Sequence, residues 1–166
     1  MLETMPVTAQ DVMTRKVFVV RSDASLLEAV RLMADHQISG VVVVDENDRP
    51  VGVLTEGDLL RFHGEFNERQ TAWLGRLSEG TELAGDFIKF LQEGSRRVSR
   101  LMTTGVITVT PDTPAWSIAR IFFDHGIKRV PVVDAGGKLV GIVSRADLVR
   151  AFVKALSAPP SPPTLD

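Results

Sequence analysis

Two stretches of this chain carry nearly the same pattern: VVVVDENDRPVGVLTEGDLLR at residues 41–61 and VPVVDAGGKLVGIVSRADLVR at residues 130–150. The match extends toward the N-terminus. Residues 12–61 align with residues 101–150 at a constant offset of 89, without a gap and with 18 of 50 positions identical. Such a repeat sets the architecture before any other feature is considered. Two copies are too few for an open solenoid, so we expect two equivalent units related by a pseudo-twofold axis.

Both copies predict the same order of elements: strand, helix, strand, hairpin turn, strand, helix. β-Branched residues predict the first strand, and apolar residues at spacings of three and four predict the helix after it. A near-continuous aliphatic run predicts a strand buried on both faces, and Asn47-Asp48 and Gly136-Gly137 mark the hairpin turns. The strands and first helix are expected at residues 17–20, 25–37, 41–44 and 51–54, and again at 106–109, 114–125, 130–133 and 139–143. The predicted fold class is α/β (α+β), a small unit present twice.

The first helix of each copy is expected to bury one apolar face against its own strands. The residues of these faces are Leu26, Ala29, Val30 and Met33 in the first copy, and Trp116, Ile118, Ile121 and Phe122 in the second. Met13 and Met102 precede the first strands and are interpreted as core-filling side chains.

The chain between the two copies matches neither of them and is predicted to form a helical insert. Two interpretations of its apolar stripe stay open: it packs on its own module, or Trp73, Phe87 and Phe90 form part of a subunit contact. The Pro-rich end of the chain is expected to be extended and poorly ordered. The predicted domains are repeat 1 at residues 8–62, the insert at 63–97, repeat 2 at 98–155 and the tail at 156–166.

Composition excludes several classes of function. The net charge of −2 gives no electrostatic reason to expect nucleic acid or an anionic membrane as partner. No apolar run approaches the roughly 20 residues that a membrane span needs. The chain has three histidines and no cysteine, which argues against a structural zinc site and fits a cytoplasmic location. We expect no metal site and no required cofactor.

The motif with the most chemistry is Gly-x-x-[Ser/Thr]-x-x-Asp at the last strand-to-helix junction of each copy. It consists of Gly52, Thr55 and Asp58 in the first copy and of Gly141, Ser144 and Asp147 in the second. Glycine allows the backbone to approach a bound group, a hydroxyl at a helix start beside free N–H groups can hold phosphate, and a carboxylate accepts the paired hydroxyls of a ribose. Together these groups suit an adenosine nucleotide.

The same motif has a purely structural interpretation. Ser or Thr followed three residues later by an acidic residue, before an apolar helix, is also the capping box, which needs no ligand. Its occurrence in both copies, each time after a strand that begins near a glycine, keeps the ligand interpretation open. A capped helix start can also still bind an anion.

The order of the motifs resembles the cystathionine-β-synthase (CBS) domain. The residues that carry this resemblance are Met-Thr before the first strand, Asp-His at a helix end, the Val-Val-Asp strand and the closing Gly-x-x-[Ser/Thr]-x-x-Asp. Two such domains form a Bateman module, and the resemblance covers nearly all of residues 8–155 except the insert. The insert itself resembles the spacer of some bacterial stand-alone proteins of this kind.

The resemblance implies two clefts that bind AMP, ADP, ATP or S-adenosylmethionine as regulatory ligands, each completed by residues of both copies. The first predicted cleft consists of Thr55, Asp58, Gly105, Val106, Lys128, Arg129 and Val130. The second consists of Ser144, Asp147, Lys16, Val17, Ser39, Gly40 and Val41. It also implies a homodimer that contacts through the helices of the repeats.

The two predicted clefts differ in charge. Lys128 and Arg129 occupy a place where relatives commonly carry basic residues facing phosphates, and Arg is a bidentate phosphate donor. The matching Ser39-Gly40 carries no charge. We therefore expect the Asp58 cleft to bind phosphorylated ligands more tightly than the Asp147 cleft.

The sequence shows no nucleophile, base and orienting group in a recognisable arrangement, so we do not expect an enzyme. The first hypothesis is a regulatory module that binds an adenosine nucleotide and transmits the binding state to an effector protein. The alternative is a ligand-free scaffold for homo-oligomerisation or interaction that uses the helical insert.

Overall fold

The computed structural model describes residues 7–63 and 97–157, and in the last turn of the helix that ends at His63 it describes the backbone only. The predictions for Trp73, Phe87 and Phe90 in the insert, and for the Pro-rich tail, therefore lie outside the described residues. The domain boundaries predicted from the sequence stay a prediction, as does the pseudo-twofold relation of the two units.

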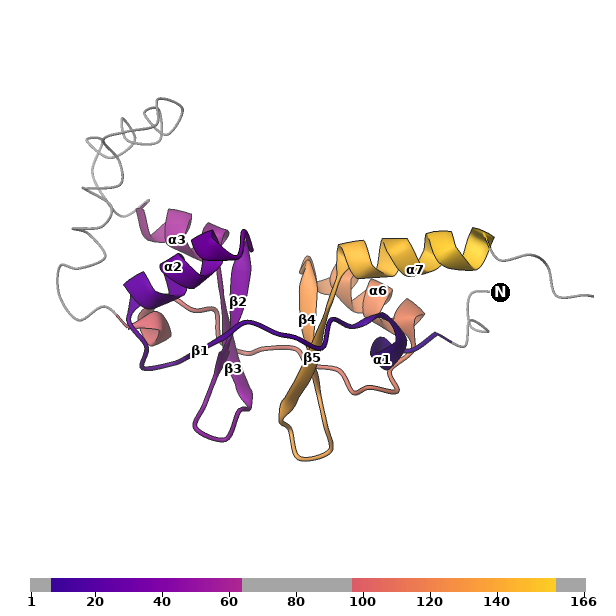
Figure 1. The fold of residues 1–166 in the computed structure, drawn as a ribbon, viewed down its shortest axis with the longest axis horizontal. Coiled ribbons are helices and arrows are strands. Elements are labelled where there is room, and N and C mark those ends of the chain that lie inside the picture. The colour runs from indigo at the N-terminus through magenta and orange to yellow at the C-terminus, as the bar shows by residue number, and fades with distance from the viewer. Residues whose placement is uncertain (1–6, 64–96, 158–166) are drawn as a thin grey trace, which may run out of the picture. The chain divides into compact units, whose positions relative to one another are not determined.

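The described chain mixes helices and strands, and each copy contains the predicted helix, hairpin and closing helix in that order (Figure 1). The first copy contains α1 (Ala9–Val12), β1 (Val19–Arg21), α2 (Leu26–Asp35), β2 (Gly40–Val44), β3 (Pro50–Thr55) and α3 (Glu56–His63). The second copy contains a short 3-10 helix (Val98–Arg100), α6 (Ala115–His125), β4 (Arg129–Val133), β5 (Leu139–Ser144) and α7 (Arg145–Ser157). The predicted α/β (α+β) class is confirmed.

The compact units of the structure do not coincide with the two sequence copies. One unit, called unit 1, joins Met1–Val17 to Ile107–Asp166, and the other, called unit 2, comprises Phe18–Val106. Each unit thus combines the hairpin of one copy with the segment that precedes the first strand of the other copy. We call this segment the exchanged segment of the unit. In Figure 1 the indigo N-terminal segment accordingly runs beside the orange and yellow elements.

Unit 2 is built on a three-stranded sheet in the order β1-β2-β3. Strands β1 and β2 are parallel, with Val20 opposite Val43, and β2 and β3 form the antiparallel hairpin. The segment from the second copy joins the free edge of β3, where Val53 and Thr103 exchange two backbone hydrogen bonds of 3.0 and 2.9 Å. Both backbone groups of Val53 are therefore satisfied by the exchanged segment.

Unit 1 repeats this arrangement around the antiparallel pair β4-β5. Thr14 of the N-terminal segment exchanges two backbone hydrogen bonds with Ile142 of β5, at 2.9 and 3.0 Å. The offset of 89 relates Thr14 to Thr103 and Val53 to Ile142. The two units therefore use equivalent residues to receive the exchanged segment.

The first strand of each copy differs from its prediction. The strand expected at residues 17–20 lies at Val19–Arg21, and the strand expected at residues 106–109 is reduced to a single parallel bridge between Val109 and Val132. Pro131 stands in β4 where Val42 stands in β2. Proline has no N–H to donate, so the parallel ladder cannot extend past it.

Each unit has its own hydrophobic core beneath its helices. In unit 2, α2 buries Leu26, Ala29 and Met33 against the valines of β2, as predicted. In unit 1, α6 buries Ala115, Ile118 and Phe122. Trp116 is only half-buried, so its predicted place in this core is wrong, because the small Ala115 one position earlier takes the buried site.

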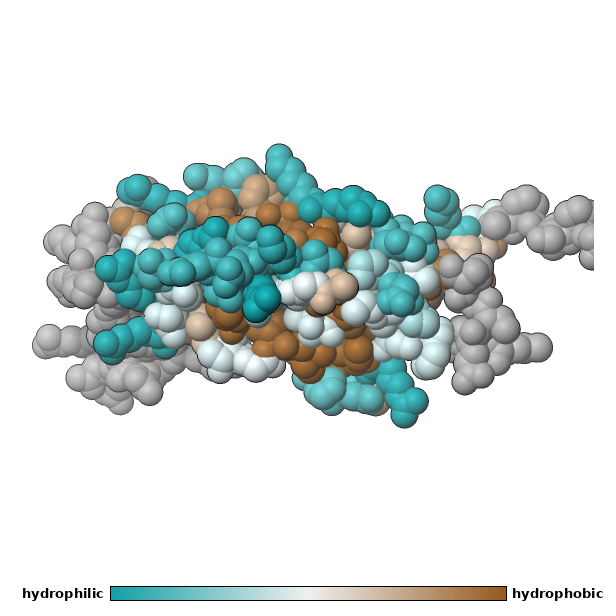
Figure 2. Space-filling view, turned by 90° about the horizontal axis from the view of Figure 1, so that it is seen from below, coloured by the Kyte–Doolittle hydropathy of each residue, from teal (hydrophilic) through white to brown (hydrophobic). Residues whose placement is uncertain are grey.

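The surface is of mixed polarity. On the face drawn in Figure 2, apolar residues reach the surface between hydrophilic ones, as is usual for folded proteins. Within residues 7–63 and 97–157, the helices are all too short or too polar to cross a bilayer.

An aspartate closes the hairpin turn of each unit. Asp45 Oδ1 accepts hydrogen bonds from the N–H groups of Asn47 and Arg49, at 2.8 and 3.0 Å, and the equivalent Asp134 accepts from Gly136 and Lys138. The N–H of Arg49 is the main reason why the pKa of Asp45 lies below its ordinary value. The Asp of the Val-Val-Asp pattern is therefore a turn-forming residue.

A methionine of the exchanged segment packs on a glycine of the hairpin in each unit. A Cβ atom added to Gly52 would lie 2.5 Å from Met102 Sδ, and one added to Gly141 would lie 2.4 Å from Met13 Sδ. The structure thus gives these glycines a packing role, because a methionine sulfur occupies the space where a side chain would lie. Their predicted role beside a bound group stays a prediction. Met13 and Met102 fill the core as predicted.

We predict that Gly52→Ala and Gly141→Ala each lower the free energy of unfolding by about 1–3 kcal/mol, the usual cost of overpacking. The added methyl group has to displace the methionine that holds the exchanged segment. Urea unfolding followed by circular dichroism measures the effect. Gly57→Ala is the control, because its Cβ meets only Thr55 Oγ1 at an ordinary 3.5 Å. Equal stability of all three variants would contradict the prediction.

Candidate functional site

The motif of unit 2 lies where β3 ends and α3 begins. Thr55 donates its backbone N–H and its hydroxyl to Asp58 Oδ2, at 2.8 and 3.0 Å, and its hydroxyl oxygen accepts from the N–H of Asp58 at 3.3 Å. Asp58 is 5% exposed. These three bonds close a capping box around the first turn of α3.

The motif of unit 1 has the same geometry at the junction of β5 and α7. Ser144 donates its N–H and hydroxyl to Asp147 Oδ2 at 2.7 and 2.8 Å, and accepts from the N–H of Asp147 at 3.2 Å. Asp147 is 8% exposed. The capping interpretation of the motif is therefore confirmed in both units.

A third pair of the same kind begins α1. Thr8 donates its N–H and hydroxyl to Asp11 Oδ2, both at 2.8 Å. The backbone N–H of Thr8, and then its hydroxyl, hold the pKa of the exposed Asp11 below its ordinary value. Asp11 is thus an exposed counterpart of the two buried carboxylates.

The buried carboxylates differ from a simple cap in the use of their second oxygen. Asp58 Oδ1 accepts the hydroxyl of Thr103 at 3.0 Å, and Asp147 Oδ1 accepts the guanidinium of Arg150. Both oxygens of each buried carboxylate are therefore hydrogen-bonded, as burial of a charged group requires. The Oδ1 oxygen is the one that the capping box does not use.

The structure assigns the residues of each predicted cleft to both units. Of the first cleft, Thr55, Asp58, Gly105 and Val106 lie in unit 2, whereas Lys128, Arg129 and Val130 lie in unit 1. Of the second cleft, Ser144, Asp147, Lys16 and Val17 lie in unit 1, whereas Ser39, Gly40 and Val41 lie in unit 2. Each carboxylate thus shares a unit with the exchanged segment that was predicted to complete its site. The full clefts stay a prediction.

The basic pair expected to face phosphate lies beside the motif of its own unit. Arg129 is opposite Ser144 in the β4-β5 pair, and the carbonyl of Lys128 accepts the N–H of Arg145 at 3.0 Å. Gly40 and Ser39 hold the same places relative to Thr55 and Glu56 in unit 2. The predicted contribution of Lys128 and Arg129 to the Asp58 cleft stays a prediction.

Two partners of the carboxylates were not predicted from the sequence. In the sequence, Thr103 stands out only as part of the repeated Met-Thr pair, and Arg150 only as the end of the repeated stretch. The usable signal was that Thr14 and Thr103, and Arg61 and Arg150, are identical in both copies. The contact of Thr103 with Asp58 depends on segment exchange, which spacing alone does not reveal. Asp147 and Arg150 stand three residues apart on one helix, and this spacing is a usable signal for an ion pair.

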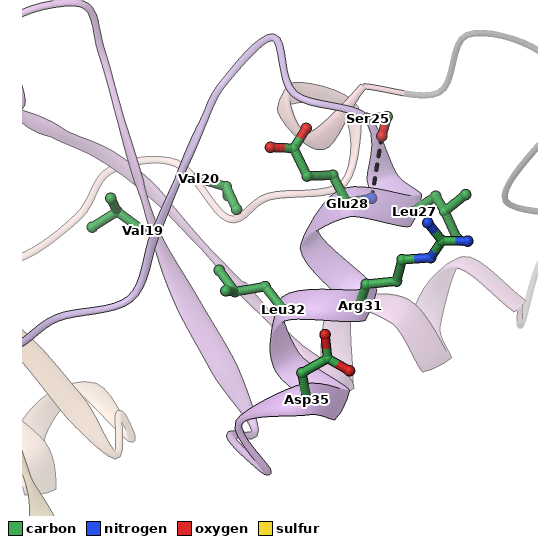
Figure 3. Close-up of a pocket in the computed structure, with 8 residues that line it drawn as sticks. All are labelled: Val19, Val20, Ser25, Leu27, Glu28, Arg31, Leu32 and Asp35. Atoms are coloured by element: carbon green, nitrogen blue, oxygen red, sulfur yellow. Dashed lines mark hydrogen bonds between the residues drawn. The ribbon is translucent and has the colours of Figure 1, made fainter.

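Two grooves lie on the described surface of the separate units. The groove of unit 2 measures about 410 Å³ and runs between β1 and α2, where Val19, Val20 and Leu32 form an apolar wall near Glu28 and Asp35 (Figure 3). It contains none of the predicted site residues. The groove of unit 1 measures about 580 Å³ and lies between α1 and α7. Asp147 and Thr14 line it together with Asp11, Arg150 and Lys154.

The fold and the repeated motif define a tandem α/β module in which two carboxylates occupy equivalent helix starts. The family model described as the CBS domain matches residues 9–65 and residues 98–154. This chain therefore belongs to the CBS domain family, as a tandem pair.

Three relatives illustrate this membership. The uncharacterized protein MJ1426 of Methanocaldococcus jannaschii is 32% identical over 152 residues, which cover 87% of this chain and 90% of that protein. The crystal structure of CBSX2 in complex with AMP is 30% identical, covers 90% of this chain and 98% of that chain, and has a TM-score of 0.68; CBSX2 comes from Arabidopsis thaliana. The CBS domain pair of protein MJ0100, in complex with 5′-methylthioadenosine and S-adenosyl-L-methionine, is 25% identical, covers 88% and 99%, and has a TM-score of 0.64.

These relatives confirm the predicted family. The two named with their organism come from an archaeon and a plant, so they do not support the narrower resemblance to bacterial stand-alone proteins. Two of the solved relatives hold an adenosine-containing ligand.

We predict that Thr103→Val lowers the free energy of unfolding by about 1–2 kcal/mol, because Asp58 Oδ1 loses a hydroxyl donor. Thermal or urea unfolding measures the change. Thr104→Val, at the neighbouring exposed position, is the control and should be nearly neutral. Equal effects of the two substitutions would show that the hydroxyl of Thr103 does not stabilise the carboxylate.

Proposed function

We propose that this protein binds an adenosine-containing nucleotide through Asp58 and Asp147 and transmits the binding state to an effector protein. The observation that supports this most strongly is the repeated motif: two buried carboxylates held in one orientation, each with an oxygen outside its capping box. A carboxylate held in this way is an acceptor for the hydroxyls of a ribose, and its own side chain is already fixed in position.

The relatives support the chemical class of the ligand. CBSX2 was solved with AMP, and the MJ0100 pair with 5′-methylthioadenosine and S-adenosyl-L-methionine. Adenosine is common to all three ligands. We accordingly propose AMP, ADP, ATP or S-adenosylmethionine as ligand, without a required cofactor, and a regulatory role. A cytoplasmic location, expected from a chain without cysteine, is part of the same proposal.

We also propose that the transmitted change is a shift between two states of the module, because a ligand moves an equilibrium only by its differential affinity for the two states. The carboxylates cap α3 and α7 directly. A ligand that contacts Oδ1 therefore acts at the first turn of these helices.

We predict that AMP at a concentration 100-fold above its Kd stabilises the protein by about 2.7 kcal/mol, seen as a rise of several degrees in the melting temperature. Asp58→Asn and Asp147→Asn should each reduce this rise, and the double variant should abolish it. Thermal shift and isothermal titration calorimetry measure the two quantities.

Asp134→Asn is the control for the loss of a carboxylate, because Asp134 accepts two backbone N–H groups at the hairpin turn, away from the motif. It should keep the response to AMP. The proposal fails if AMP, ADP, ATP and S-adenosylmethionine all leave the melting temperature of the wild-type protein unchanged.

The predicted homodimer is also proposed, with α6 and α7 of unit 1 in the contact. These two helices pack on each other and expose four large apolar side chains: Phe123 is 85%, Val149 59%, Val153 57% and Leu156 86% exposed. The three residues on α7 lie at spacings of four and three, on one helical face. Exposed apolar surface of this kind marks an interaction site.

We predict that Phe123→Glu combined with Leu156→Glu converts a dimer into a monomer, because each charge would be buried without a partner in the contact. Size-exclusion chromatography with light scattering measures the mass. Ala155→Glu is the matched control on another face of α7, and should leave the mass unchanged. A wild-type protein that is monomeric at all concentrations tested would contradict the proposed contact.

A further inference from the structure

Asp147 pairs a buried carboxylate with an exposed cation. The side chain of Asp147 is 8% exposed, whereas that of Arg150, one turn later on α7, is 71% exposed. The guanidinium donates to Oδ1, and Ser144 holds Oδ2 through two hydrogen bonds. Arg150 therefore contacts the one carboxylate oxygen that the capping box leaves to other donors.

The two residues of this ion pair differ in what the loss of the partner costs them in free energy. An exposed arginine regains water when it moves away, so holding it in place contributes little. A buried carboxylate oxygen that loses its donor instead stays desolvated, which is unfavourable. Arg150 can consequently be displaced only by another donor that satisfies Oδ1. A ribose hydroxyl is such a donor.

The groove between α1 and α7 offers a second position for the displaced guanidinium. Arg150 and Lys154 line this groove from α7, and Asp11 lines it from α1. The carboxylate of Asp11 is exposed and ionised, since its pKa lies below the ordinary value because of the hydrogen bonds from Thr8. Arg150 and Asp11 thus face the same groove with opposite charges.

The other unit shows that a hydroxyl suits this oxygen. In unit 2, the hydroxyl of Thr103 donates to Asp58 Oδ1 at 3.0 Å. Thr14, the equivalent of Thr103, lines the groove beside Asp147. The same oxygen of the same motif therefore accepts a neutral hydroxyl in one unit and a cation in the other.

We propose that Arg150 is a displaceable partner of Asp147: a ribose hydroxyl takes its place on Oδ1, and the guanidinium moves into the groove toward Asp11. Arg150 then acts as a specificity-determining residue that competes with the ligand. Binding of a ligand at Asp147 then also changes the side-chain contacts between α7 and α1. This inference rests on the proposed function and adds the competition and its readout.

The test uses adenosine, which carries no phosphate, so that other basic residues contribute little to its binding. All proteins carry Asp58→Asn, so that calorimetry reports on Asp147. Arg150→Ala should tighten adenosine binding about two- to fivefold, because the competing guanidinium is solvent-exposed and its pairing contributes only modestly. Arg150→Lys should restore the wild-type affinity. Arg145→Ala is the matched control, because Arg145 is an exposed arginine of the same helix that donates to the carbonyl of Ile127.

Two further readouts separate competition from a merely structural role. Adenosine binding to the protein with Arg150 should tighten when salt is raised from 20 to 300 mM, a range chosen to screen the exposed pair, and binding to Arg150→Ala should not change. 2′,3′-Dideoxyadenosine, which lacks the paired 2′- and 3′-hydroxyls, should bind Arg150→Ala no better than the protein with Arg150.

The outcomes distinguish the displacement of Arg150 from the proposed ligand binding at Asp147. Adenosine binding that is unaffected or weakened by Arg150→Ala, and insensitive to salt, overturns the displacement and leaves the proposed function intact. Absence of adenosine binding whichever residue stands at position 150 overturns the proposed role of Asp147, and the displacement with it.

Discussion

The exchange of a short segment between the two copies is the constraint on which the rest of the structure depends. An isolated hairpin is at best marginally stable in water, and the outer edge of its second strand stays unpaired unless another segment covers it. Here a Met-Thr pair from the other copy completes that edge. The threonine satisfies both backbone groups of Val53 or Ile142, and the methionine fills the space over a glycine. The hairpin, the helix start and the carboxylate then hold their positions together.

The capping box and the proposed ligand site are parts of one design. The capping bonds use Oδ2 of each aspartate and fix its side chain, while Oδ1 meets a donor from elsewhere in the unit. A fixed and buried acceptor loses little entropy on binding, so the same cap would also prepare Oδ1 for the proposed ligand. The two interpretations of the motif are therefore compatible, and the geometry explains why: they use different oxygens.

Much of the architecture could be predicted from sequence, because the repeat and the periodic apolar residues are local signals. The helices, the hairpins and the buried strands of valine follow from them. The strand at residues 106–109 could not be predicted correctly, since its pairing fails at Pro131, which is distant in sequence. The burial of Trp116 is predicted wrongly for a related reason. Helical spacing identifies an apolar stripe, but which of its residues are buried depends on the packing partner, and here Ala115 is buried instead. The contact of Thr103 with Asp58 likewise needs three-dimensional information, because the two residues are 45 positions apart, whereas the pair of Asp147 and Arg150 has the local spacing of a helical ion pair.

The exchanged segments also determine how the chain would respond to a break between the copies. Residues up to 63 supply most of the described part of unit 2 and also the N-terminal segment of unit 1. Residues from 97 onward supply the rest of unit 1 and the exchanged segment of unit 2. The two pieces of a nicked chain would each hold the missing edge of the other, as in a pair of interlocking fragments. Neither half of the gene would then encode a self-sufficient domain, and the duplication would have to be inherited as a whole.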